Sequence, residues 1–158
     1  MNAVLNGVYI DGEWRAGHDV LEVINPATES RLAQVSVGDM AAVTQAVDAA
    51  SRAFAGWSKS TGRERGALLR KIAQGVREQR EALMHLQSSN NGKPLFEAGI
   101  DVDDVIATFE YYAGVAEDLD AGQDRPVALP SDEFSARLRR EPCGVVGLIV
   151  PWNFPMVT

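Results

Sequence analysis

The sequence contains a single cysteine and only two histidines among its 158 residues. One cysteine cannot form an internal disulfide, so nothing in the chain indicates an oxidising compartment. The two histidines, His18 and His85, lack companions at metal-ligand spacing, and we expect both at the surface. Cys143 has neither histidine nor lysine beside it, so we expect a small buried apolar residue rather than a nucleophile.

Basic residues and long apolar runs are also scarce. The 15 lysines and arginines against 22 acidic residues leave a net charge of -7, which argues against nucleic acid as a partner because phosphate binding needs a basic surface. The longest apolar run, residues 145–150, is far shorter than the ~20 residues of a membrane span. The N-terminus has no signal-peptide pattern. We therefore expect a cytoplasmic protein with no membrane partner.

Turn and cap signals divide the chain into a strand-rich start and a helical middle. Asp11-Gly12 predicts a hairpin turn, Asp39 a helix N-cap, and Thr61 to Glu64 a capping box. Gly92 is suited to the left-handed residue that ends a helix. The expected elements are a hairpin over residues 7–15, strands at 20–24 and 32–37, and helices at about 39–55, 61–91 and 94–119.

The last part of the chain predicts two further strands and a rigid corner. Residues 134–140 alternate apolar and polar side chains, as a half-exposed strand does. Residues 145–150 are apolar and rich in β-branched side chains, which indicates a buried strand. Pro151 and Pro155 then prevent the ladder from continuing. Because ligands bind beyond the carboxyl ends of strands in α/β sheets, Asn153 between these prolines is a candidate site residue.

Several motifs in this order resemble the NAD(P)-dependent aldehyde dehydrogenase superfamily. They are Asn25-Pro26-Ala27-Thr28, Asn91-Gly92-Lys93-Pro94, Tyr111-Tyr112-Ala113-Gly114, Arg140 to Gly147, and Pro151-Trp152-Asn153-Phe154-Pro155. The resemblance covers the N-terminal third of a family member. It implies an α/β fold with a small antiparallel layer, three helices, an oligomerisation strand and the first strand of a Rossmann-like sheet. The implied regions are 1–123 of the cofactor-binding domain, 124–142 around the oligomerisation strand, and 143–158 as the start of the Rossmann-like sheet.

The resemblance also assigns roles at the corner. In the family a cysteine thiolate attacks the aldehyde, and the asparagine of this motif stabilises the oxyanion, which implies that Asn153 is catalytic. An amide is a suitable donor because it neither titrates nor protonates the intermediate. Backbone atoms around Val150, Pro151, Trp152 and Asn153 would line NAD or NADP. The alternative for Asn153 is a turn residue that caps the next helix, and for Trp152 it is plain packing.

The substrate residues implied by the resemblance are Asp101, Asp104 and Phe154. The segment around the two aspartates resembles the aminoaldehyde and betaine aldehyde branch, in which two acidic positions at the tunnel mouth favour a cationic substrate. The alternatives are a solvated acidic helix face and, for Phe154, a core aromatic; plant members of the branch commonly carry tyrosine at that position. Asn90 stands where many members have an acidic residue, so we expect no bound metal cation.

The function that follows is the N-terminal portion of an enzyme that oxidises a small-molecule aldehyde to the acid. The family's nucleophile and general base lie downstream of Asn153, so we expect the isolated chain to be inactive. The resemblance implies a homo-oligomer, either dimer or tetramer. The alternative is a non-catalytic fragment that associates with a full-length enzyme, for example by pairing its 134–140 strand.

Overall fold

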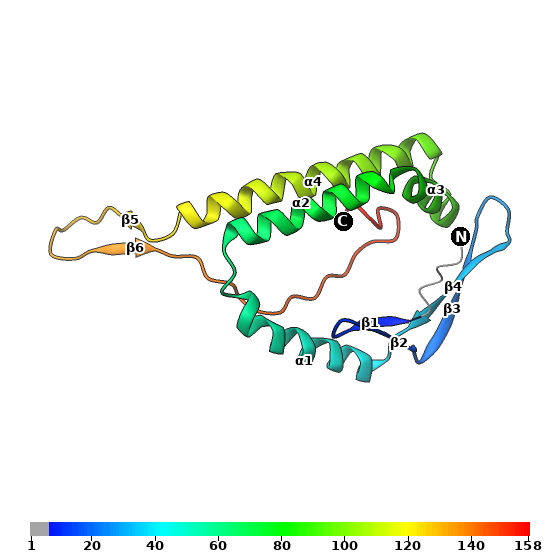
Figure 1. Cartoon of the computed structure of the whole chain (residues 1–158), viewed down its shortest axis with the longest axis horizontal. Coiled ribbons are helices and arrows are strands. Elements are labelled where there is room, and N and C mark those ends of the chain that lie inside the picture. Colours follow the sequence, from blue (N-terminus) through cyan, green and yellow to red (C-terminus); the bar gives the residue numbers. More distant parts are fainter. Residues whose placement is uncertain (1–6) are drawn as a thin grey trace.

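The computed structural model describes residues 7–158, which begin with two antiparallel hairpins (Figure 1). Asp11 and Gly12 both have positive φ, 57° and 82°, as a tight hairpin turn requires, so the predicted first hairpin is confirmed. The second hairpin confirms the other two expected strands and carries a bulge near its turn. The four strands are β1 (Val8–Ile10), β2 (Glu13–Arg15), β3 (Asp19–Ile24) and β4 (Arg31–Val37).

The first helix, α1 (Met40–Trp57), begins where the sequence predicts. The carboxylate of Asp39 accepts a hydrogen bond from the backbone nitrogen of Ala42 at 2.8 Å, which caps the first turn. The helix packs on β1, where Ile10 and Ala49 are buried. Both predicted features, the cap and the helix, are confirmed.

The predicted helix over 61–91 is two helices in the structure, α2 (Gly62–Glu78) and α3 (Arg80–Asn91), so four helices replace the expected three. The capping box at Thr61 and Glu64 is confirmed. The chain bends at Gln79, whose backbone nitrogen donates to Val76 three residues earlier at 3.1 Å. A contact with the following helix stabilises the bend. Arg80, the first residue after Gln79, forms a two-point ion pair with Asp103, with both hydrogen bonds at 2.7 Å.

The longest helix, α4 (Leu95–Ala121), packs along both α2 and α3 (Figure 1). Its Val102 is wholly buried and packs with Ala73 of α2 and with Ile106 in the main apolar cluster. Arginines of α2 form ion pairs with carboxylates of α4 along the same contact. These pairs are Arg65–Asp120, Arg70–Glu117 and Arg77–Glu110. The helical part of the chain therefore has its own core, closed at its edge by charge pairs.

Beyond α4, a two-stranded ribbon of β5 (Arg125–Val127) and β6 (Ala136–Leu138) projects from the end of the helices (Figure 1). The strand expected over 134–140 is thus present but shorter. Residues 139–158 contain no helix or strand and run back between α1 and the α2–α4 helices in the view of Figure 1. Within residues 7–158 no helix combines the length and apolarity that a bilayer-spanning segment requires.

The expected buried strand over 145–150 is not formed. Leu148 and Ile149 are almost fully exposed, and the segment has no ladder partner among residues 7–158. A strand's backbone groups must pair with neighbouring strands, and apolar composition alone cannot replace those neighbours. Cys143 is likewise exposed rather than buried, because the segment that it introduces joins no sheet among residues 7–158. His18 and His85 lie at the surface, as expected.

Candidate functional site

The proline-flanked corner forms a compact bend at the end of the described chain. Residues 152–154 bend, residues 155–157 turn, and the backbone nitrogen of Thr158 donates to the carbonyl oxygen of Phe154 at 3.2 Å. The Thr158 hydroxyl donates to the same oxygen at 2.6 Å. The side chain of Asn153 is exposed at this bend. Asn153 is therefore an exposed residue of a locally closed loop.

This corner rests on the junction between α3 and α4. The side-chain amide of Asn91 donates to the carbonyl oxygen of Asn153 at 3.4 Å. The ammonium of Lys93 lies over the ring of Phe154, 3.8 Å from its centroid, a cation–π contact that contributes about 0.5–2 kcal/mol depending on desolvation. Met156 packs against the main apolar cluster. Contacts of Asn153, Phe154 and Met156 thus fix the corner to the helical core.

Lys93 is itself held in place by α4. Its ammonium forms an ion pair with the carboxylate of Asp101, which is only 6% exposed. The amide nitrogen of Gln87, on α3, donates to the same carboxylate oxygen. A buried carboxylate needs such partners, because an unpaired charge away from water is costly. Lys93 therefore connects a buried anion on one side with the aromatic ring of the corner on the other.

The structure separates the two aspartates that the sequence groups together. Asp101 and Asp104 both lie on α4, but Asp101 is buried against Lys93 and Gln87 whereas Asp104 is exposed. A cationic ligand in solution would meet Asp104 and would have to displace Lys93 to reach Asp101. The structure brings Asp101 and Phe154 together through the lysine between them.

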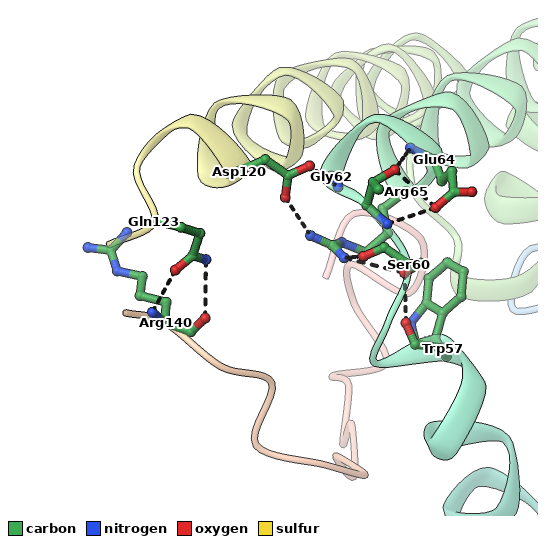
Figure 2. Close-up of polar contacts among 9 residues, drawn as sticks. Trp57, Ser60, Gly62, Glu64, Arg65, Asp120, Gln123 and Arg140 are labelled. Carbon is green, nitrogen blue, oxygen red and sulfur yellow. Dashed lines mark hydrogen bonds and ion pairs between the residues drawn. The ribbon is translucent and has the colours of Figure 1, made fainter. Parts of the chain in front are cut away.

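The segment that leads to the corner is anchored at its other end as well. Gln123, just after α4, receives a hydrogen bond from the backbone nitrogen of Arg140 at 2.9 Å and donates to its carbonyl oxygen at 3.1 Å (Figure 2). Nearby, Arg65 donates to Ser60 and pairs with Asp120 where α2 meets the end of α4 (Figure 2). The expected cofactor-contacting residues lie on the exposed stretch between the two anchors. They are Val150, Pro151 and Trp152, and the fourth expected residue, Asn153, lies at the second anchor.

Sequence reasoning missed the anchoring role of Asn91 and Lys93, which it treated as a helix end. The signal that could have revealed it is the position of a lysine directly after the left-handed Gly92, eight residues before an aspartate on the following helix. Since Gly92 has a φ of 78°, the chain reverses there and returns Lys93 toward the first turns of α4. Among residues 7–158, no group of three or more His, Cys, Asp or Glu side chains is arranged to hold a metal ion.

Comparison with known proteins agrees with the α/β architecture and the motif order. The family model for the aldehyde dehydrogenase family matches residues 14–158, and this chain belongs to that family. The structure resembles betaine aldehyde dehydrogenase from Staphylococcus aureus, solved in complex with NAD+, with a TM-score of 0.88 and 36% identity over 96% of this chain. The fold class expected from the sequence, an N-terminal part of the aldehyde dehydrogenase fold, is therefore confirmed.

The curated relatives include dehydrogenases of aminoaldehydes and of betaine aldehyde. Peroxisomal aminoaldehyde dehydrogenase 1 of Pisum sativum is 44% identical over 157 residues. Chloroplastic betaine aldehyde dehydrogenase of Beta vulgaris is 40% identical over 157 residues. In both cases the match covers 95% of this chain and 31% of the relative. The chain thus spans about a third of the length of these relatives.

Proposed function

We propose that this chain supplies the oxyanion-binding corner and part of the cofactor-binding surface of an NAD(P)-dependent aldehyde dehydrogenase. The observation that carries the proposal is the anchored, exposed residue Asn153, whose carbonyl oxygen accepts a hydrogen bond from Asn91. An exposed amide on an anchored bend is what an oxyanion donor requires, since the donor must be in place before negative charge develops.

Asn153 acts as a neutral hydrogen-bond donor in this proposal. When a thiolate adds to the aldehyde carbon, the carbonyl oxygen gains negative charge, and the NH₂ group of Asn153 donates to it. The donor cannot release a proton to the oxyanion, so the intermediate stays ready to collapse. The cysteine and the general base are the residues that the family carries downstream of this motif, and the product is the carboxylic acid.

The nicotinamide cofactor, when bound, supplies the hydride acceptor. Val150, Pro151 and Trp152 fit a contact with it, because all three are exposed and none belongs to a helix or strand. Trp152 is 80% exposed and offers a broad apolar surface beside Asn153. Solved relatives in complex with NAD+ support a nicotinamide cofactor for the family.

We further propose an aminoaldehyde or betaine aldehyde as the substrate, with Asp104 as the residue that attracts its cationic end. Asp104 is exposed, whereas the charge of Asp101 is already balanced by Lys93. Asp101 then serves the substrate indirectly, by fixing the lysine beneath Phe154. The similarity to aminoaldehyde and betaine aldehyde dehydrogenases supports this class of substrate.

The test is a chimera in which this chain replaces the matching N-terminal third of the pea aminoaldehyde dehydrogenase. We expect NAD-dependent oxidation of an aminoaldehyde, and a kcat lower by about 10²–10³-fold in the Asn153→Ala variant. KM should change little, because the donor acts chiefly in the transition state. Asn90→Ala, at another exposed asparagine, is the matched control and should keep full activity. Equal activity of the Asn153→Ala and parent chimeras would overturn the proposal.

The 158-residue chain by itself should show no turnover with an aminoaldehyde and either NAD+ or NADP+. Its only cysteine, Cys143, is the one thiol available. Measurable oxidation by the isolated chain, abolished in Cys143→Ser, would contradict the assignment of the nucleophile to the downstream part of the family sequence.

A second candidate function is association without catalysis. The observation that favours it is the β5–β6 ribbon, which projects from the helices (Figure 1). Val127 and Leu138 of this ribbon are both exposed. Such a ribbon has free edges onto which a strand of an intact dehydrogenase subunit can add. Co-purification of the tagged chain with a full-length relative tests this function, and the absence of a complex at micromolar concentrations counts against it.

A further inference from the structure

We propose that Lys93 is a positioning residue for the corner that carries Asn153. The inference deepens the proposed function, on which its catalytic meaning rests. The ammonium of Lys93 contacts the carboxylate of Asp101 and the ring of Phe154, whose centroid is 3.8 Å away. Phe154 directly follows Asn153, so the position of the ring limits the positions that the amide can take.

The contact between Lys93 and Phe154 joins a lysine held by buried residues to an uncharged corner. Asp101 and Gln87 are buried on α4 and α3, and they hold the lysine through an ion pair and a shared carboxylate oxygen. The corner brings no charged side chain of its own to this contact. It offers an aromatic face, which attracts a cation through the negative potential of its ring. The lysine therefore holds the corner through the ring of Phe154.

Asn91, beside Lys93, adds a second contact to the same corner. Asn91 accepts from the backbone nitrogen of Lys93 at 3.0 Å with its side-chain oxygen, and with its side-chain nitrogen it donates to the Asn153 carbonyl oxygen. One short segment thus contacts both Asn153 and Phe154. Loss of the charge at position 93 should free the ring first and the amide with it, while α2 and α4 keep their own core.

The experiment measures backbone order parameters by ¹⁵N relaxation across the full 158-residue chain. We expect values near about 0.85 for the non-proline residues of 152–157 in the parent chain and below about 0.6 in Lys93→Met. Values in α2 and α4 should stay unchanged. Lys93→Arg keeps a cation over the ring and should restore the order of the corner. Lys71→Met, at an exposed lysine of α2, is the matched control and should leave the corner as it is.

Because Lys93→Met leaves Asp101 buried without its cation, that variant can lose stability throughout. Phe154→Leu avoids this, since it removes the aromatic face but keeps the Lys93–Asp101 pair. It should produce the same local loss of order at 152–157 with the helices intact. Unchanged order in Phe154→Leu, or failure of Lys93→Arg to restore it, overturns the proposal.

A second measurement separates the positioning role from the proposed function. In the pea chimera, Phe154→Leu and Lys93→Met should lower kcat by about 10–100-fold, as small misplacements of a catalytic group do, with a smaller change in KM. If the parent chimera is inactive, the proposed function fails while the relaxation result still decides the role of Lys93. If the chimera is active and these variants keep full kcat, the positioning role fails alone.

Discussion

A methyl group on Gly62 would lie 1.9 Å from the carbonyl oxygen of Ala116, far inside the closest contact that a Cβ atom makes with a non-bonded atom. Gly62 is the first residue of α2, and its backbone nitrogen donates to the carboxylate of Asp120 at 2.5 Å. The start of α2 and the end of α4 therefore touch backbone to backbone. This close approach sets the spacing between α2 and α4 at this end of the helices.

Gly62→Ala should destabilise the chain by about 1–3 kcal/mol, because the new methyl group would clash with the backbone of Ala116, which is fixed within α4. Urea unfolding followed by circular dichroism measures the effect. Gly75→Ala is the matched control in the same helix, since no atom lies within 4 Å of the added methyl group. It should stabilise α2 by about 1 kcal/mol through helix propensity. A neutral Gly62→Ala would show that the two helices can separate freely at this end.

Acid should weaken the contact of α4 with α2 and α3. Hydrogen bonds from Arg70 lower the pKa of Glu117 from its ordinary 4.5, and those from Arg80 lower the pKa of Asp103 from 3.8. Since the folded chain binds fewer protons than the unfolded one, this stabilisation is complete above these ordinary values and disappears as pH falls through the lowered ones. Urea unfolding between about pH 7 and about pH 3 should show the loss.

Arg70→Met should reduce the part of this acid sensitivity that comes from Glu117. Arg52→Met is a suitable control, because Arg52 pairs with Asp11 of the first hairpin rather than with α4. The Arg70–Glu117 and Arg52–Asp11 ion pairs are both exposed, so high salt should reduce the difference in stability between each variant and the parent chain. An acid dependence that Arg70→Met leaves unchanged would mean that other carboxylates dominate it.

Asp104→Asn in the pea chimera should raise KM for a cationic aldehyde by several-fold and leave KM for a neutral aldehyde unchanged. The reason is that an exposed carboxylate raises the local concentration of a cation. Asp103→Asn is the neighbouring control, because that carboxylate is engaged by Arg80. Equal effects on the two aldehydes would remove Asp104 from substrate recognition.

Cys143 should react with a thiol reagent in the native chain at a rate close to that of the urea-denatured chain, because its side chain is exposed. Absorbance of the released thiolate from an aromatic disulfide reagent follows the reaction. Cys143→Ser gives the blank, since the chain has no other cysteine. Labelling that waits for unfolding would show that residues 143–150 pack against the helices in solution.

Features that depend on a few adjacent residues could be predicted from the sequence. Asp11-Gly12, the Asp39 cap and the Thr61–Glu64 box each satisfy backbone groups within one turn, so neighbours in sequence suffice to define them. The bend at Gln79 escaped prediction because its cause is distant, the pairing of Arg80 with Asp103. The apolar pattern of α3 continues that of α2 and gives no sign of a break.

The candidate site shows the same division. The corner and its exposed Asn153 follow from two prolines and a motif, whereas the support beneath it depends on where α4 brings Asp101. The apolar, β-branched composition of residues 145–150 is typical of a strand, but a strand is defined by the partners of its backbone, and residues 7–158 provide none. Exposure of Cys143 follows from the same missing partners.

The exposed apolar segment around Ile149 should make the purified chain prone to self-association. Two molecules that meet there can satisfy each other's open backbone groups and hide their apolar side chains together, which is the first step of fibrous assembly. Sulfate strengthens that attraction by favouring burial. Dilute, sulfate-free buffer should therefore preserve single molecules, and turbidity should rise with protein concentration well before the helices melt.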